Sequence, residues 1–167
     1  GLKTNISYTI YTNLHTNTAY SSLAAQVTKI FPITLNTFII PTIYGRFIFN
    51  DGIPFMYSNV IGGEGYNPHY EQQIPFSGLT HTESTLKLLG NAQIQVRHKF
   101  HEKQYLTLSG NYAIHQNQFS NFLQGKKIYG TSIGYGYDSP LGPIEGFICY
   151  SNRTNKLGFY LNIGFGF

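Results

Sequence analysis

The serine at position 132 is the residue whose surroundings most resemble a catalytic motif. Gly130-Thr131-Ser132-Ile133-Gly134 has the residue types of a nucleophile elbow, in which a serine occupies a sharp turn between a strand and a helix. These residues belong to an alternating stretch, 127–138, that predicts a strand. Because the strained turn cannot form inside a strand, we predict no catalytic serine and no enzymatic activity for this chain.

Metal chemistry would need ligands at a fixed spacing, which the sequence does not supply. Glu64, Glu71 and Glu83 offer oxygen ligands in a long loop but lack the regular spacing of a calcium loop. The single cysteine, Cys149, excludes an intrachain disulfide and a cysteine-rich zinc site. We therefore expect no metal and no cofactor. No two histidines have the spacing of a His-Glu-x-x-His site, and the six are His15, His69, His81, His98, His101 and His115.

The composition is that of a chain whose surface is not adapted to water. Charged residues make up only 11% of the 167 residues, while aromatic residues reach 16%, with 14 Tyr, 13 Phe and no Trp. A soluble domain normally keeps a charged surface. The net charge of +4 is modest and scattered, which excludes nucleic acid as a partner. The sequence has no run of about 18 apolar residues that would form a transmembrane helix.

The elements that must position these residues are strands, because apolar residues recur at every second position. About nine segments carry apolar residues on one face and Asn, Gln, Ser, Thr or Gly on the other. A face of small, mostly uncharged polar residues opposite an apolar face is typical of a barrel that encloses a lumen within a lipid bilayer. We therefore predict one all-β domain over residues 1–167, an antiparallel transmembrane β-barrel. The clearest segments are residues 4–14, 90–100, 104–115, 127–138, 144–151 and 156–167.

Several segments of the first half are harder to interpret. Residues 19–31 also fit a helical period, although a strand is favoured. Residues 34–49 are apolar on both faces around Pro41, which cannot donate to a ladder, so we expect a bulge or distortion there. Residues 54–62 predict a short strand. The stretch from about 63 to 87 is predicted to be an irregular, polar loop.

Four charged residues are predicted to face the lumen, where unpaired charge is costly and partners or water are expected. Neutralisation of the lumen is the simplest role for them, and lining a pore or holding the loop is the alternative. An inward Glu145 also turns Phe147 into the lumen, which conflicts with a polar interior. The four charged residues are Arg97, Lys99, Asp138 and Glu145.

The last predicted strand keeps its alternation to the final residue. Barrels of the outer membrane typically end in such a strand with a terminal Phe, which the insertion machinery reads. The alternative is that Phe167 only marks where a longer chain was cut. The predicted insertion signal consists of Gly158, Leu161, Ile163, Phe165 and Phe167.

Residues 61–79, residues 136–145 and the closing strand resemble the carboxy-terminal barrel of patatin-like phospholipases from Bacteroidota. Those barrels belong to the bacterial surface antigen superfamily, together with barrel assembly and two-partner secretion proteins. The resemblance implies a long extracellular loop that is opened by a double glycine, folds back into the lumen and precedes five strands. Where the family has an arginine paired with a lumen acid, this chain has His69, and the alternative is a solvated loop tip. The implied loop motif is Gly62, Gly63, His69, Tyr70, Gln72 and Gln73.

The resemblance also implies a barrel of sixteen strands, of which about eight or nine would form the carboxy-terminal half in this chain. We expect a bacterial outer-membrane protein whose partners are the lipid bilayer, the barrel insertion machinery, and the remainder of its own barrel or another subunit. Its predicted function is to anchor, and to translocate or conduct for, a patatin-like or assembly-type outer-membrane protein. The alternative is a complete eight-stranded barrel with a structural or ligand-binding role through its outer loops.

Overall fold

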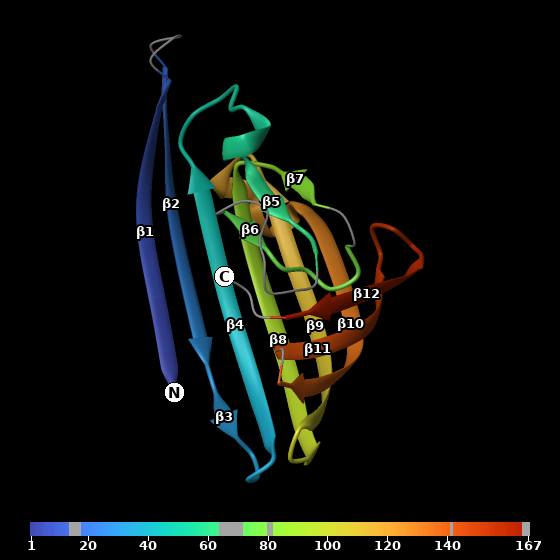
Figure 1. Cartoon of the computed structure of the whole chain (residues 1–167). Helices are drawn as coiled ribbons and strands as arrows, with labels where there is room; N and C mark the ends of the chain where they lie inside the picture. The colour runs from blue at the N-terminus through green and yellow to red at the C-terminus, as the bar shows by residue number, and fades with distance from the viewer. Residues whose placement is uncertain (14–17, 64–71, 80–81, 141, 165–167) are drawn as a thin grey trace.

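Eight long strands form the frame of the molecule. The computed structural model describes residues 1–13, 18–63, 72–79, 82–140 and 142–164. Figure 1 shows the long strands following one another in chain order, and the predicted long strands are confirmed, including the segment that also fitted a helix. They are β1 (Leu2–Asn13), β2 (Thr18–Lys29), β4 (Thr37–Ile48), β8 (Leu88–His101), β9 (Gln104–Gln116), β10 (Lys126–Ser139), β11 (Gly142–Ser151) and β12 (Leu157–Ile163).

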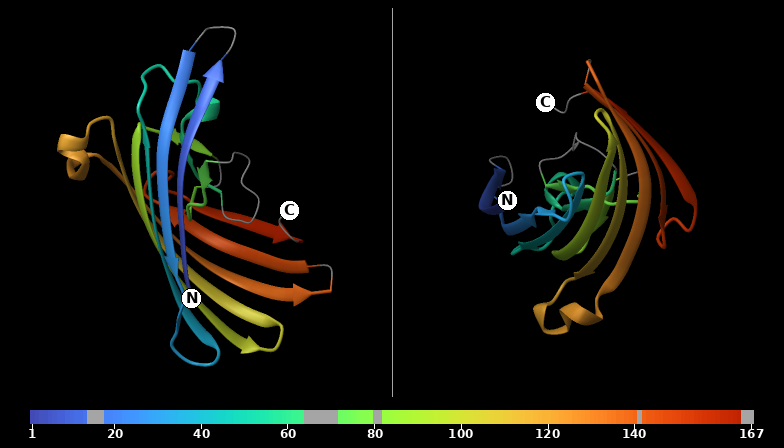
Figure 2. Two further views of the ribbon diagram at one scale, coloured as in Figure 1. Left: turned by 90° about the vertical axis from the view of Figure 1, so that its left-hand side faces the viewer. Right: turned by 90° about the horizontal axis from the view of Figure 1, so that it is seen from below.

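The long strands make one antiparallel sheet in the order β1-β2-β4-β8-β9-β10-β11-β12, and the short β3 (Phe31–Pro32) pairs with β4. Eight of the nine predicted segments correspond to these long strands, the ninth, residues 54–62, lies outside this sheet, and β3 was not predicted as a separate strand. Figure 2 shows the sheet curved into a trough. Among the described residues β1 pairs only with β2, and β12 only with β11, so both edges of the sheet are open. The fold is therefore that of a transmembrane β-barrel wall that is not closed.

The two faces of the sheet have opposite character, as the alternation predicts. On the convex face Ile94 is 58% exposed and Phe159 67% exposed, although both are large and apolar. On the concave face Asn91, Thr107 and Ser109 are buried. A water-exposed sheet would reverse this distribution, whereas lipid on the convex face accounts for it. Among the described residues, the helices are all too short and too polar to cross a membrane.

Pro41 interrupts one ladder without shifting its register. Pairing between β2 and β4 stops at Thr28 opposite Thr42 and resumes in β3 with Phe31 opposite Ile39, the same number of residues further along both strands. On its other side Pro41 stays in register with Ile94 of β8. The expected distortion is thus present as a gap in pairing, because proline has no N–H to donate, and the expected bulge was wrong.

The long connection between β4 and β8 is more ordered than its composition indicates. It contains a 3₁₀ turn, η1 (Phe55–Tyr57), and a small sheet in which β5 (Asn59–Ile61) lies between β6 (Gln73–Ile74) and β7 (Glu83–Thr85). The short strand predicted at 54–62 is limited to β5. The predicted loop of about 63–87 is not irregular and polar throughout, since it contains β6 and β7 and since its Phe76 and Leu79 are buried with Ile61 of β5 against Leu89, Ala113 and Ile128 of the sheet.

The assignment of the two faces predicts how the sheet tolerates a charge. Ile94→Arg and Leu108→Arg place a guanidinium against acyl chains and should each destabilise the protein by about 2–4 kcal/mol. Gln95→Arg, on the concave face of the same strand, should cost clearly less. Denaturant unfolding of the full chain in lipid vesicles measures the three differences. An equal cost at Gln95 would mean that the faces are assigned the wrong way round.

Candidate functional site

The candidate site is the contact between the long connection and the concave wall of the sheet. Its centre is the segment Pro75–Leu79, which lies against β9 and β10. The carbonyl group of Ser77 approaches Gly130 so closely that a methyl group at that position would collide with it. This explains one glycine on the inner face of β10, because only a residue without Cβ lets the loop backbone come this near.

Three polar contacts hold the same segment. The Ser77 amide donates to Asn111 Oδ1 at 3.4 Å, and the Ser77 and Ser132 hydroxyls are 3.2 Å apart. Asn111 Nδ2 in turn donates to the Pro75 carbonyl at 3.5 Å. Ser77, Asn111 and Ser132 are buried, so these bonds satisfy side-chain and backbone groups that have little access to water. The elbow-like serine is therefore a buried residue in the middle of β10, with the role of a loop contact.

Gly78 makes the second close approach. Its φ of +85° lies in the left-handed region, and a side chain there would collide with the backbone of Tyr150 in β11. Thr154 Oγ1 donates to the Gly78 carbonyl at 3.5 Å. The loop is thus anchored to β9, β10 and β11, and each of its two closest approaches requires a glycine, Gly130 on the wall and Gly78 in the loop.

The double glycine predicted to open the loop starts this turn. Gly62 and Gly63 have φ of 125° and 77°, and the Gly63 amide donates to the Leu79 carbonyl while the Phe76 amide donates to the Gly63 carbonyl at 3.0 Å. Gln73 Nε2 donates to the Gly62 carbonyl at 2.8 Å. Gln72 lies away from this turn, with its amide donating to the Met56 carbonyl. His69 and Tyr70 lie outside the described residues, so their anchoring role stays a prediction.

A charged cluster lies on the wall beside the loop. Glu145 is only 2% exposed, and its Oε1 accepts a hydrogen bond from the Tyr105 hydroxyl at 2.8 Å and lies 3.4 Å from Arg97 Nη2. The Arg97 guanidinium stacks over the Tyr105 ring, 4.5 Å from its centroid, and donates to Thr107. Burial of the carboxylate is tolerable because it has both a cation and a hydroxyl donor.

Only two of the four predicted lumen charges belong to this cluster. Lys99 and Asp138 lie on the same face but near the ends of their strands, where both are exposed. Phe147 does point inward, and its ring packs against Gly134, while the Tyr105 ring packs against Gly136. The inner-face glycines of β10 therefore make room for aromatic rings, which resolves the conflict seen in the sequence.

Arg46 was not predicted as a site residue from the sequence, and it binds the first part of the connection between β4 and β8. It is 4% exposed and donates to the carbonyl of Ser58 at 3.2 Å, to Asn59 Oδ1 at 3.1 Å and to Ser22 Oγ at 3.1 Å. Asn59 Nδ2 then donates to the Leu86 carbonyl at 2.8 Å. An arginine within an apolar strand was the available signal, because such a charge needs an inward partner.

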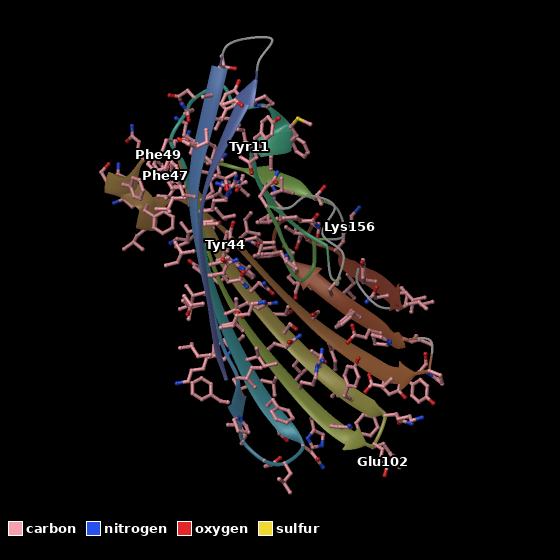
Figure 3. The ribbon with its side chains drawn as sticks, turned by 60° about the vertical axis from the view of Figure 1, so that its left-hand side comes forward. Tyr11, Tyr44, Phe47, Phe49, Glu102 and Lys156 are labelled. Carbon is pink, nitrogen blue, oxygen red and sulfur yellow. The ribbon has the colours of Figure 1, made fainter. Side chains whose placement is uncertain are left out.

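A cavity of about 360 Å³ separates the loop from β1, β2, β4 and β8. Tyr11 and Tyr44, both labelled in Figure 3, line it together with carboxamides such as Gln26 and Gln93. The Asn91 Oδ1 atom in this lining is buried and has no hydrogen-bond partner among the described residues. The lining offers hydrogen bonds and one buried guanidinium, which suits water or a small polar solute.

The remaining predicted site residues are on or beyond β12. Leu161 and Ile163 are exposed on the convex face and Gly158 is on the concave face, whereas Phe165 and Phe167 lie outside the described residues. The insertion signal stays a prediction. No three His, Cys, Asp or Glu side chains converge within the described part of the chain.

An antiparallel sheet with a lipid-compatible convex face, a polar concave face and an inward loop between its third and fourth long strands defines the class as an outer-membrane-type barrel. The profile of the OMP85 superfamily matches residues 2–167. The chain belongs to this superfamily, which is the bacterial surface antigen superfamily that the sequence resembles. Neither the search of curated proteins nor the search of solved structures returns a match.

The charged cluster predicts how much stability is lost when the Tyr105 hydroxyl is removed. Tyr105→Phe removes the hydroxyl donor from buried Glu145 and should destabilise the protein by about 1.5–3 kcal/mol, since hydrogen bonds to charged groups are strong. Tyr135→Phe is the control, because Tyr135 lies on the convex face, is 48% exposed and contacts Phe100 through its ring. Thermal or denaturant unfolding measures both. Equal, negligible changes would show that Glu145 does not depend on Tyr105.

Proposed function

We propose that this sheet is one wall of an outer-membrane barrel and that the Pro75–Leu79 segment holds a plug against its inner surface. The wall anchors the protein in the bilayer, and movement of the plug opens a path for ions or polypeptide. The observation that carries this proposal is the approach of the Ser77 carbonyl to Gly130, because it fastens the loop to the lumen side of the sheet. Superfamily members as a class are outer-membrane assembly and secretion barrels.

The open edges support completion of the barrel by further strands. Backbone groups cannot remain unpaired in hydrocarbon, so both β1 and β12 need a neighbour within the membrane. The remainder of the same barrel or another subunit is the proposed source. A closed barrel of these eight strands alone is not favoured, because β1 and β12 do not pair among the described residues.

The orientation of the wall follows from its connections. At one end the strands are joined by short turns, at residues 33–36, 102–103 and 140–141, and at the other by longer segments, including 49–87 and 117–125. Outer-membrane barrels have short periplasmic turns and longer extracellular loops. The plug is therefore proposed to enter the lumen from the extracellular side.

The parent protein is proposed on resemblance alone. The segments at 61–79 and 136–145 resemble patatin-like barrels, for which the wall would anchor a lipase domain, with the insertion machinery acting on the last strand. An assembly or secretion role is the second candidate, favoured by the superfamily assignment.

One pair of glycine substitutions tests the plug. Gly130→Ala forces the Ser77 carbonyl away from the wall, whereas Gly110→Ala on the convex face of β9 adds a methyl group with no atom within 4 Å. In planar bilayers, the Gly130 variant should raise open-channel conductance or its frequency relative to both the unchanged chain and the Gly110 variant. Limited proteolysis should cut the 62–79 segment faster in the Gly130 variant. Faster proteolysis with unchanged conductance would mean that the loop does not gate a path.

A further inference from the structure

The hairpin connection between β9 and β10 leaves the barrel wall on its lipid side. It contains the short η2 (Phe119–Gln124), which projects from the sheet on the side opposite the long connection, as Figure 2 shows. The Phe122 ring rests against Gly90 of β8, on the same face of that strand as the exposed Ile94. The connection therefore folds back over the convex surface rather than extending into the space above the lumen.

A group of phenylalanine rings fixes η2 in this position. The Phe119 ring lies 4.4 Å from that of Phe47 in β4, and the Phe47 ring lies 4.7 Å from that of Phe49. Phe47 and Phe49 are labelled in Figure 3 beside η2, across the strands from Tyr11. Leu88 belongs to the same convex face and is only 8% exposed, whereas Ala92 and Ile94 further along that face are exposed. The surface beneath η2 is thus covered by this connection.

The outward side of η2 combines large exposed apolar side chains with the exposed polar residues Ser120, Asn121 and Gln124. Phe119 remains 63% exposed and Leu123 76% exposed, and Phe49 beside them is 50% exposed. The patch is continuous with the convex apolar face of the strands. Lys127 follows directly, is exposed and lies on the convex face opposite Ile114, whereas Lys126 lies on the concave face opposite His115. Apolar side chains next to a lysine that reaches toward phosphates are the pattern of a segment lying at the boundary between acyl chains and headgroups.

We propose that η2 is a lipid anchor, with Phe119 and Leu123 inserted among the acyl chains of the leaflet at the long-loop rim and Lys127 near lipid phosphates. The partner is lipid because η2 covers a surface that already faces lipid. A protein partner at this place would have to displace lipid from the same surface. The anchor sets how deeply the strands sit in the bilayer. It does so at the same end of the sheet at which the connection between β4 and β8 begins.

The absence of tryptophan from the chain makes a direct measurement possible. Phe119→Trp and Leu123→Trp each introduce one fluorophore at an exposed position, and Glu102→Trp introduces one in the short turn between β8 and β9 as the control. The full-length variants are folded into phosphatidylcholine vesicles with and without bromine on the acyl chains. Heat-modifiable migration on a gel verifies that each variant has folded.

The anchor predicts blue-shifted emission from both η2 variants and quenching by brominated lipid several-fold stronger than for the Glu102 variant. The control should instead be quenched by aqueous iodide. Emission from both η2 variants as red as the control, with equal iodide quenching, would overturn the proposal in favour of a water-exposed loop. Blue emission that neither quencher reduces would overturn it in favour of a protein cover.

Discussion

The pairing of every backbone group within lipid is the constraint on which this structure depends. Hydrocarbon offers no hydrogen-bond partners, so each strand must satisfy its N–H and C=O groups through its neighbours. The sheet does so across seven consecutive antiparallel pairings of long strands. Its composition follows, because one face meets acyl chains and the other encloses a lumen. Pro41 shows how local the exceptions are, since pairing lapses beside it and then resumes in the same register.

The concave face reflects a second constraint, the limited space within a curved sheet. Gly130, Gly134 and Gly136 on β10 each lack a side chain where something else occupies the space, namely the Ser77 carbonyl, the Phe147 ring and the Tyr105 ring. Glycine here is a packing residue that gives aromatic rings and a loop backbone access to the wall. The same arrangement brings Tyr105 to Glu145, so packing and electrostatics on this wall are coupled.

The connection between β4 and β8 links these features to function. Arg46 binds the first part of the connection at the Ser58 carbonyl, Asn59 donates to the Leu86 carbonyl near its end, and Gly78 approaches β11. Phe76 and Leu79 of the same connection are buried against Leu89 and Ala113 of the sheet. The connection is therefore held to the wall by one apolar cluster and a few hydrogen bonds, and not by the ladders of the long strands. The lipid-side connection around η2 is a separate feature on the opposite face.

Alternation in the sequence was sufficient to predict the long strands, their two faces and the membrane environment, because the period of two is a local property of each strand. It also placed Arg97 and Glu145 inside. The apolar core of the long connection was not predictable in this way. Ile61, Phe76 and Leu79 follow no period, and they are buried only because the connection packs against the sheet.

What the sequence by itself determined is therefore the class of fold and the environment of each face. The tertiary structure alone decided which residues meet across long separations: Ser77 with Gly130, Arg97 with Glu145, and Phe122 with Gly90. The physical reason is that these contacts depend on strand register and sheet curvature, which arise from all the strands together and are not encoded in any one segment.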